Sequence, residues 1–246
     1  MIVLKLGGSV ITEKDRAETL DGDALERATD AIAAALEAGL EDLVVVHGGG
    51  SFGHHNASEH GVSTTAGTHD ASAVLEIHGA MKTLNRFVLS RLLERDVAAV
   101  PVHPFSAAHR DSEGRLELPT GQVETMLAEG FVPVLHGDLI AHAGAGATVV
   151  SGDELVTSLA GDLEADRVGL CSTVPGVLDG EDAVIDRIDE FDAVADVLGA
   201  SDATDVTGGM AGKVQTLLDL EAEASIFGLE ALESFLEGAE PGTTID

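Results

Sequence analysis

The stretch that does most to decide the fold is Leu43-Val44-Val45-Val46-His47-Gly48-Gly49-Gly50-Ser51-Phe52-Gly53-His54. Four apolar residues run into three glycines, which is the pattern of a buried strand that ends in a tight turn. Because glycine has no Cβ, the backbone of such a turn can approach an anion closely and point its N–H groups at it. His54 can supply one more donor just past the turn. The stretch therefore predicts phosphate binding, against the alternative of a plain turn followed by a structural histidine.

The composition favours one α/β chain with an aliphatic core. The 246 residues are 44% hydrophobic but only 3% aromatic, and Trp and Tyr are absent. This length suits one large domain or two small lobes, and a core of Val, Leu, Ile and Ala is typical of a parallel sheet covered by helices. Cys171 is the single cysteine, so we expect no internal disulfide and a cytoplasmic protein. We expect no signal peptide and no membrane span.

The charge excludes several classes of partner. With 44 acidic and 13 basic side chains the net charge is -31, which would repel nucleic acid and anionic membranes. The high apolar content argues against a disordered chain. An acidic, lysine-poor surface over an apolar core suggests a halophilic protein, since high salt screens the self-repulsion.

Apolar periodicity predicts alternating strands and helices, and hence a mostly parallel sheet. We expect strands at 2–6, 43–47, 97–102, 131–135, 167–171 and 243–245, and helices at 23–38, 71–95, 121–129, 151–163 and 229–236. A further helix is expected from the glycine-rich segment 205–213 to about Ala222. We expect hairpins at 105–119 and 139–149, and a β-ribbon after residue 177. Residues 53–70 carry four histidines, but their spacing suits no compact metal site, so a solvated loop is expected.

Three more glycine-rich segments accompany the first: Lys5-Leu6-Gly7-Gly8-Ser9, Ser151-Gly152-Asp153-Glu154 and Asp205-Val206-Thr207-Gly208-Gly209-Met210-Ala211-Gly212-Lys213. Lysine is scarce, and Lys5, Lys14 and Lys213 lie in or near these segments. Turns after parallel strands gather at the sheet edge where ligands bind. Backbone donors and cations around a migrating charged group are what phosphoryl transfer needs. The Walker motif and the protein-kinase signatures are absent.

Taken together, the four segments resemble the successive motifs of the amino acid kinase family. The resemblance spans residues 5–213 in order. It implies a three-layer αβα sandwich around a mainly parallel open sheet. It also implies a single domain over 1–246, in which 1–150 form the acceptor-binding lobe and 151–246 the nucleotide-binding lobe.

Within this family, the segment from Gly48 to His54 resembles the members that phosphorylate isopentenyl phosphate to the diphosphate. The resemblance implies ATP and Mg²⁺, isopentenyl phosphate as the small-molecule partner, and a homodimer. The implied catalytic residues are His54, Lys14 and Lys5. The implied ATP contacts are Lys5, Leu6, Gly7, Gly8, Ser9, Gly50, Gly209 and Lys213. The implied acceptor contacts are Gly49, His54 and Gly152, and no residue is implied as a metal ligand.

Two alternatives stay open at this point. Fosfomycin kinases share a similar histidine, so another acceptor on the same scaffold, such as fosfomycin, an amino acid or UMP, is possible. A nucleotide-binding regulatory or dehydrogenase-like module is the non-kinase alternative, although its Gly-x-Gly-x-x-Gly match at 48–53 is a weak signal. The turn Cys171-Ser172-Thr173-Val174-Pro175-Gly176-Val177-Leu178 departs from the Asp-Val-Asp-Gly-Val-Tyr type of relatives, so we assign no nucleotide contact there. The apolar face of the helix at 71–95 is expected to be core, and its first turns a candidate lining for a prenyl tail.

Overall fold

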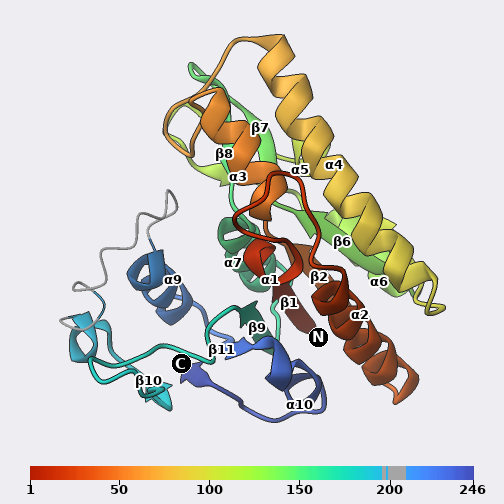
Figure 1. Ribbon diagram of the computed structural model, residues 1–246, viewed down its shortest axis with the longest axis vertical. Helices are drawn as coiled ribbons and strands as arrows, with labels where there is room; N and C mark the ends of the chain where they lie inside the picture. The colour runs from red at the N-terminus through yellow and green to blue at the C-terminus, as the bar shows by residue number, and fades with distance from the viewer. Residues whose placement is uncertain (196–197, 199–208) are drawn as a thin grey trace.

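The computed structural model describes residues 1–195, 198 and 209–246. Within these ranges, eight strands form the main sheet in the order β10-β12-β11-β9-β1-β2-β6-β3 (Figure 1). The strands from β3 to β11 in this order run parallel, whereas β11 and β12 are antiparallel. Their bounds are β1 Ile2–Leu6, β2 Leu43–His47, β3 Ala99–Pro101, β6 Val132–His136, β9 Arg167–Ser172, β10 Arg187–Ile188, β11 Glu223–Gly228 and β12 Thr243–Ile245. The mainly parallel sheet predicted from the sequence is confirmed.

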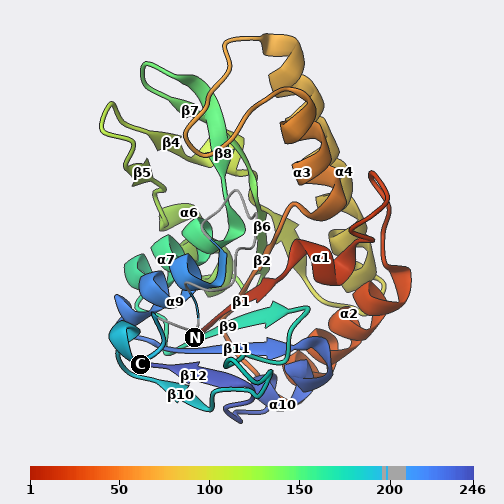
Figure 2. The same ribbon diagram turned by 60° about the vertical axis from the view of Figure 1, so that its left-hand side comes forward.

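Helices cover both faces of this sheet, as Figure 2 shows. One core packs α1, α2, α4 and α10 against the sheet, and the other packs α6, α7 and α9 against the opposite face. The helices of the described ranges are α1 Gly8–Ile11, α2 Gly22–Glu37, α3 Gly50–Glu59, α4 Ala71–Leu93, α5 Pro104–Ala107, α6 Gly121–Ala128, α7 Gly152–Asp162, α9 Gly209–Leu218 and α10 Leu232–Leu236, with 3-10 turns at Phe191–Ala193 and Leu229–Ala231. The αβα sandwich is therefore confirmed.

The two-residue period of β1 decides which side chains reach which layer. Leu4 and Leu6 belong to the core beneath α2 and α4, and Val3 to the core beneath α7. Successive side chains of a strand point to opposite faces, so Lys5 points to the α7 side with Val3. A charged side chain is thus directed beneath a helix in the middle of the sheet, where its exposed fraction is 8%.

A second sheet lies beside α3 and α4 at one end of the molecule (Figures 1 and 2). Its strand order is β5-β4-β7-β8, with β4 His109–Arg110, β5 Leu116–Glu117, β7 Asp138–His142 and β8 Gly146–Val150. The pairs β4–β5 and β7–β8 are antiparallel. Both predicted hairpins are therefore confirmed.

The predicted loop at 53–70 is wrong for its first part, because helix α3 occupies Gly50–Glu59. His54 and His55 lie on this helix and are exposed. Glycine costs about 1 kcal/mol relative to alanine inside a helix, so local propensity gave no helix here. Contacts of α3 with α1 and α4 supply the stabilisation that the isolated segment lacks.

Several other boundaries differ from the prediction. The strand expected at 97–102 is limited to Ala99–Pro101, and the helix expected to reach Ala222 ends at Leu218. The β-ribbon after residue 177 is reduced to a bridge between Leu178 and Val184. The part of the fourth glycine segment at 205–208 lies outside the described residues. None of the helices in the described ranges combines the length and apolar character needed to cross a membrane.

Candidate active site

Two glycine turns meet backbone to backbone at the ends of β1 and β2. Leu6 and His47 are register partners at the carboxyl ends of these parallel strands. A Cβ added at Gly8 would lie 2.1 Å from the amide nitrogen of Gly50, and one added at Gly50 would lie 2.6 Å from the carbonyl oxygen of Gly8. Gly50 also has a φ of +49°, in the left-handed region that favours glycine. The first two glycine segments therefore form one surface of backbone groups.

Thr12 ties these turns together. Its Oγ1 donates to the carbonyl of Gly8 at 2.8 Å and accepts from the amide of Ser51 at 3.0 Å. The side chain of Ser51 in turn exchanges hydrogen bonds with the backbone of Thr19. The loop from Thr12 to Thr19 carries Lys14, which is exposed. Both ends of this loop are hydrogen-bonded to Ser51 at the start of α3. Thr12 and Ser51 had no role in the sequence prediction.

The third glycine segment arrives from α7. Ser151 caps this helix in a capping box with Glu154. A Cβ at Gly152 would lie 3.2 Å from Cε of Lys5 and 3.6 Å from Cα of Gly48. A Cβ at Gly137, between β6 and β7, would lie 3.5 Å from the amide nitrogen of Gly152 and 3.6 Å from that of Gly49. Backbone amides from separate segments thus converge beside a helix N-terminus, where anions are favoured.

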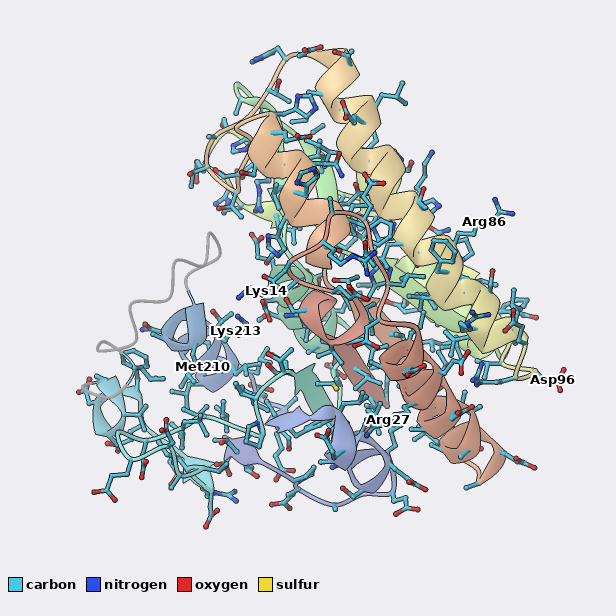
Figure 3. The ribbon with its side chains drawn as sticks, viewed as in Figure 1. Lys14, Arg27, Arg86, Asp96, Met210 and Lys213 are labelled. Carbon is cyan, nitrogen blue, oxygen red and sulfur yellow. The ribbon has the colours of Figure 1, made fainter. Side chains whose placement is uncertain are left out.

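An acidic side chain connects two of the predicted lysines. Nζ of Lys5 donates to Oδ1 of Asp153 at 2.6 Å, and Nζ of Lys213 lies 3.9 Å from Oδ2 of the same carboxylate. Lys5 comes from β1 and Lys213 from α9, so Asp153 holds two cations from opposite ends of the chain. Figure 3 shows Lys14 and Lys213 in neighbouring parts of the view. Asp153 carried no predicted functional role, although its place beside Gly152 was a usable signal.

His54 lies one turn beyond Gly50 on α3 and is exposed. It makes no hydrogen bond or ion pair with the described part of the chain, whereas His55 lies 3.6 Å from Glu59. The structure therefore brings Lys5, Lys213 and the glycine turns together through direct contacts. It places His54 and Lys14 on exposed segments that adjoin the turns. Gly209, with a φ of +61°, begins α9 four residues before Lys213.

Two buried histidines end β2 and β6 directly before glycine turns. His47 and His136 are register partners, and their rings stack with centroids 5.5 Å apart. Burial lowers the pKa of His47 to about 4, and it also lowers the pKa of His136 well below its usual value. Both rings are therefore neutral near pH 7. The sequence shows both His-Gly pairs at strand ends, but they carried no predicted role.

The amino acid kinase family matches residues 1–226 of this chain. Isopentenyl phosphate kinase of Haloferax volcanii is 61% identical over 245 residues, which cover 100% of this chain and 98% of that protein. Isopentenyl phosphate kinase of Methanocaldococcus jannaschii is 31% identical, with 100% and 98% covered. An X-ray structure of isopentenyl phosphate kinase superposes with a TM-score of 0.85 at 30% identity, over 100% of both chains. With four glycine segments in the expected order and this match along nearly its whole length, the chain belongs to the amino acid kinase family.

Proposed function

We propose that this chain transfers the γ-phosphoryl group of ATP to isopentenyl phosphate, giving isopentenyl diphosphate and ADP. The observation that carries the proposal is the 61% identity to the Haloferax volcanii isopentenyl phosphate kinase over essentially both whole chains. The convergence of the glycine turns with Lys5, Asp153 and Lys213 supports a phosphoryl-transfer site.

On the nucleotide side, we assign Lys5, Leu6, Gly7, Gly8, Ser9 and Gly50 to the ATP phosphates, with Gly209 and Lys213 completing the contacts. The supporting observation is that Gly8 and Gly50 pack backbone against backbone, so bulky side chains are kept away from both turns. The pairing with Asp153 holds Lys5 and Lys213 near each other despite their like charge. In this assignment residues 151–246 supply the nucleotide lobe and residues 1–150 the acceptor lobe.

On the acceptor side, we assign Gly49, His54 and Gly152 to the phosphate of the substrate. That phosphate is already a dianion, so its oxygen needs no strong general base to attack. What the reaction needs is charge neutralisation while two anions approach each other. Backbone amides, the lysines and the exposed imidazole of His54 supply it, and Lys14 stabilises the transferring group.

Mg²⁺ would enter with ATP and neutralise the phosphate oxygens. Mg²⁺ is commonly held by substrate phosphates with one or two carboxylates rather than by a protein cage. Both oxygens of Asp153 already face lysines, and the described residues contain no cluster of three or more His, Cys, Asp or Glu able to hold a metal. The donor set therefore suits a metal carried mainly by the nucleotide.

A substrate panel tests the proposal. ADP release is followed with ATP, Mg²⁺ and one acceptor at a time: isopentenyl phosphate, fosfomycin, N-acetylglutamate or UMP. We expect kcat/KM for isopentenyl phosphate to exceed the others by at least about a hundredfold, which corresponds to about 3 kcal/mol of discrimination. If another acceptor is turned over faster, that compound replaces isopentenyl phosphate as the proposed substrate. If the protein does not bind ATP, the proposed kinase activity is refuted. Sedimentation analysis of the same sample tests the homodimer that we also expect.

A further inference from the structure

The side chain of His47 fixes the peptide group between Gly48 and Gly49, in the glycine turn that follows β2. This side chain is fully buried, and Nδ1 lies 3.0 Å from the carbonyl oxygen of Gly48, the next residue. A carbonyl oxygen only accepts hydrogen bonds, so Nδ1 must carry the proton. The buried imidazole thus donates to a carbonyl of the glycine turn.

Because the peptide group is planar, this contact also determines where the N–H of Gly49 points. The C=O of Gly48 and the N–H of Gly49 belong to one planar trans unit and point in opposite directions. When His47 holds the carbonyl, the Gly49 N–H is aimed away from the imidazole. The neighbouring groups are already engaged, since the amide of Gly48 donates to Leu6 and the amide of Gly137 donates to the carbonyl of His47. Gly49 donates no backbone hydrogen bond to the described residues, so its N–H is available to a ligand.

The tautomer of His47 is fixed from its other side. A neutral ring protonated at Nδ1 leaves Nε2 as an acceptor, which needs a donor. Oδ1 of Asn85 lies 3.2 Å from Nε2, and Nδ2 of Asn85 has no partner among the described residues. Exchanging the two ends of this amide places its N–H donors beside Nε2 of His47, and this is the orientation that a neutral His47 requires.

His136 repeats the arrangement one strand away. Its Nδ1 lies 2.9 Å from the carbonyl oxygen of Gly137, and its Nε2 lies 2.9 Å from Nδ1 of His103. The carboxylate of Asp138 lies 3.8 Å from Nδ1 of His136, which favours the proton there. Two stacked imidazoles therefore support two adjoining glycine turns.

We propose that His47 is a positioning residue, which aims the Gly49 amide at the acceptor phosphate by donating from Nδ1 to the Gly48 carbonyl. The proposal rests on the proposed function, because it takes Gly49 as an acceptor contact. His47 touches no substrate in this scheme and acts through the turn alone. The proposal therefore predicts that loss of this hydrogen bond lowers kcat/KM for isopentenyl phosphate and leaves the KM for ATP unchanged, which a general loss of packing would not do.

The test compares His47→Asn with His47→Gln. The amide nitrogen of Asn takes the place of Nδ1 and can still reach the Gly48 carbonyl, whereas Gln extends its amide toward Nε2 and Asn85. We expect His47→Asn to keep kcat/KM for isopentenyl phosphate within about threefold. We expect His47→Gln to lose about ten- to a hundredfold, the range expected when the charge-assisted hydrogen bond from the Gly49 amide to the phosphate is weakened. The KM for ATP stays near the wild-type value in both variants. A packing role predicts the reverse order, because Gln fills more of the cavity than Asn.

Equal losses in the two variants, or a greater loss in His47→Asn, would overturn the inference. ¹⁵N NMR of the imidazoles gives a readout that needs no substrate. We expect His47 to be neutral and protonated at Nδ1 at pH 7, and protonation at Nε2 alone would also overturn the inference. If the wild-type chain turns over no acceptor of the panel, the proposed function fails, and the NMR result then decides for or against the hydrogen bond on its own.

Discussion

Replacing Asp153 with Asn tests whether this carboxylate orients two lysines for catalysis. The change keeps the size of the side chain and removes its charge. Asn still offers an oxygen in the place of Oδ1, which lies 2.6 Å from Nζ of Lys5. The buried ammonium of Lys5 nevertheless loses the carboxylate that neutralises it. Lys213, 3.9 Å from the other oxygen, loses its attraction to the same point.

The magnitude follows from the burial of the pair. Hydrogen bonds to charged groups contribute about 1.5–3 kcal/mol, against about 1 kcal/mol for a neutral pair. Complete loss of a partner in a fully buried ion pair costs about 3–5 kcal/mol. The side chains of Lys5 and Asp153 are 10% and 23% exposed, and Asn retains an acceptor, so we expect about 2 kcal/mol. For a chain of this size that lowers Tm by roughly 4–8 °C.

Asp153→Asn should lower kcat more severely than it lowers the stability of the fold. Two cations without a common anchor no longer share a fixed position near the phosphates, and we expect kcat to fall on the order of a hundredfold, as when one stabilising donor is removed. Thermal unfolding and ADP release are the measurements. Asp162→Asn is the matched control, because this exposed aspartate on the same helix has only a 3.4 Å contact with Ser158. Wild-type kcat in Asp153→Asn, with or without a change in Tm, would refute the orienting role.

Three further predictions concern the imidazole of His54, the surface charge and acid stability. His54→Ala should lower kcat by about a hundredfold or more with an unchanged Tm, while His55→Ala stays near wild type; the reverse would remove His54 from the mechanism. With a net charge of -31, Tm should rise as KCl increases from about 0.1 M to about 2 M, and a maximum at low salt would contradict this. Burial lowers the pKa of His47 from 6.5 to about 4, so the unfolded chain takes up this proton first and stability falls as pH drops from 6.5 to about 4, by up to about 3 kcal/mol. His47→Gln should flatten that part of the denaturant-midpoint profile, and an identical slope would show that other groups cause it.

The sequence by itself determined the sheet and its ligand-binding edge. Short valine-rich runs that end in glycine, such as Leu43–His47, can be little other than buried strands, because their length and β-branching leave few alternatives. Strand ends of a parallel sheet share one edge, so the order of the glycine segments located the candidate site. The scarcity of lysine singled out Lys5 and Lys213, which the structure joins through Asp153.

Only the tertiary structure decided the features that depend on contacts between distant segments. Helix α3 follows glycines that disfavour helix locally, and it is stabilised by α1 and α4. Asp153 looks like an ordinary residue of a helix N-terminus until β1 and α9 bring their lysines to it. His47 and His136 are 89 residues apart in the sequence (136 − 47). The parallel register of β2 and β6 nevertheless stacks their rings. Periodicity reports which side of an element is buried, but not which partner from elsewhere in the chain meets it there.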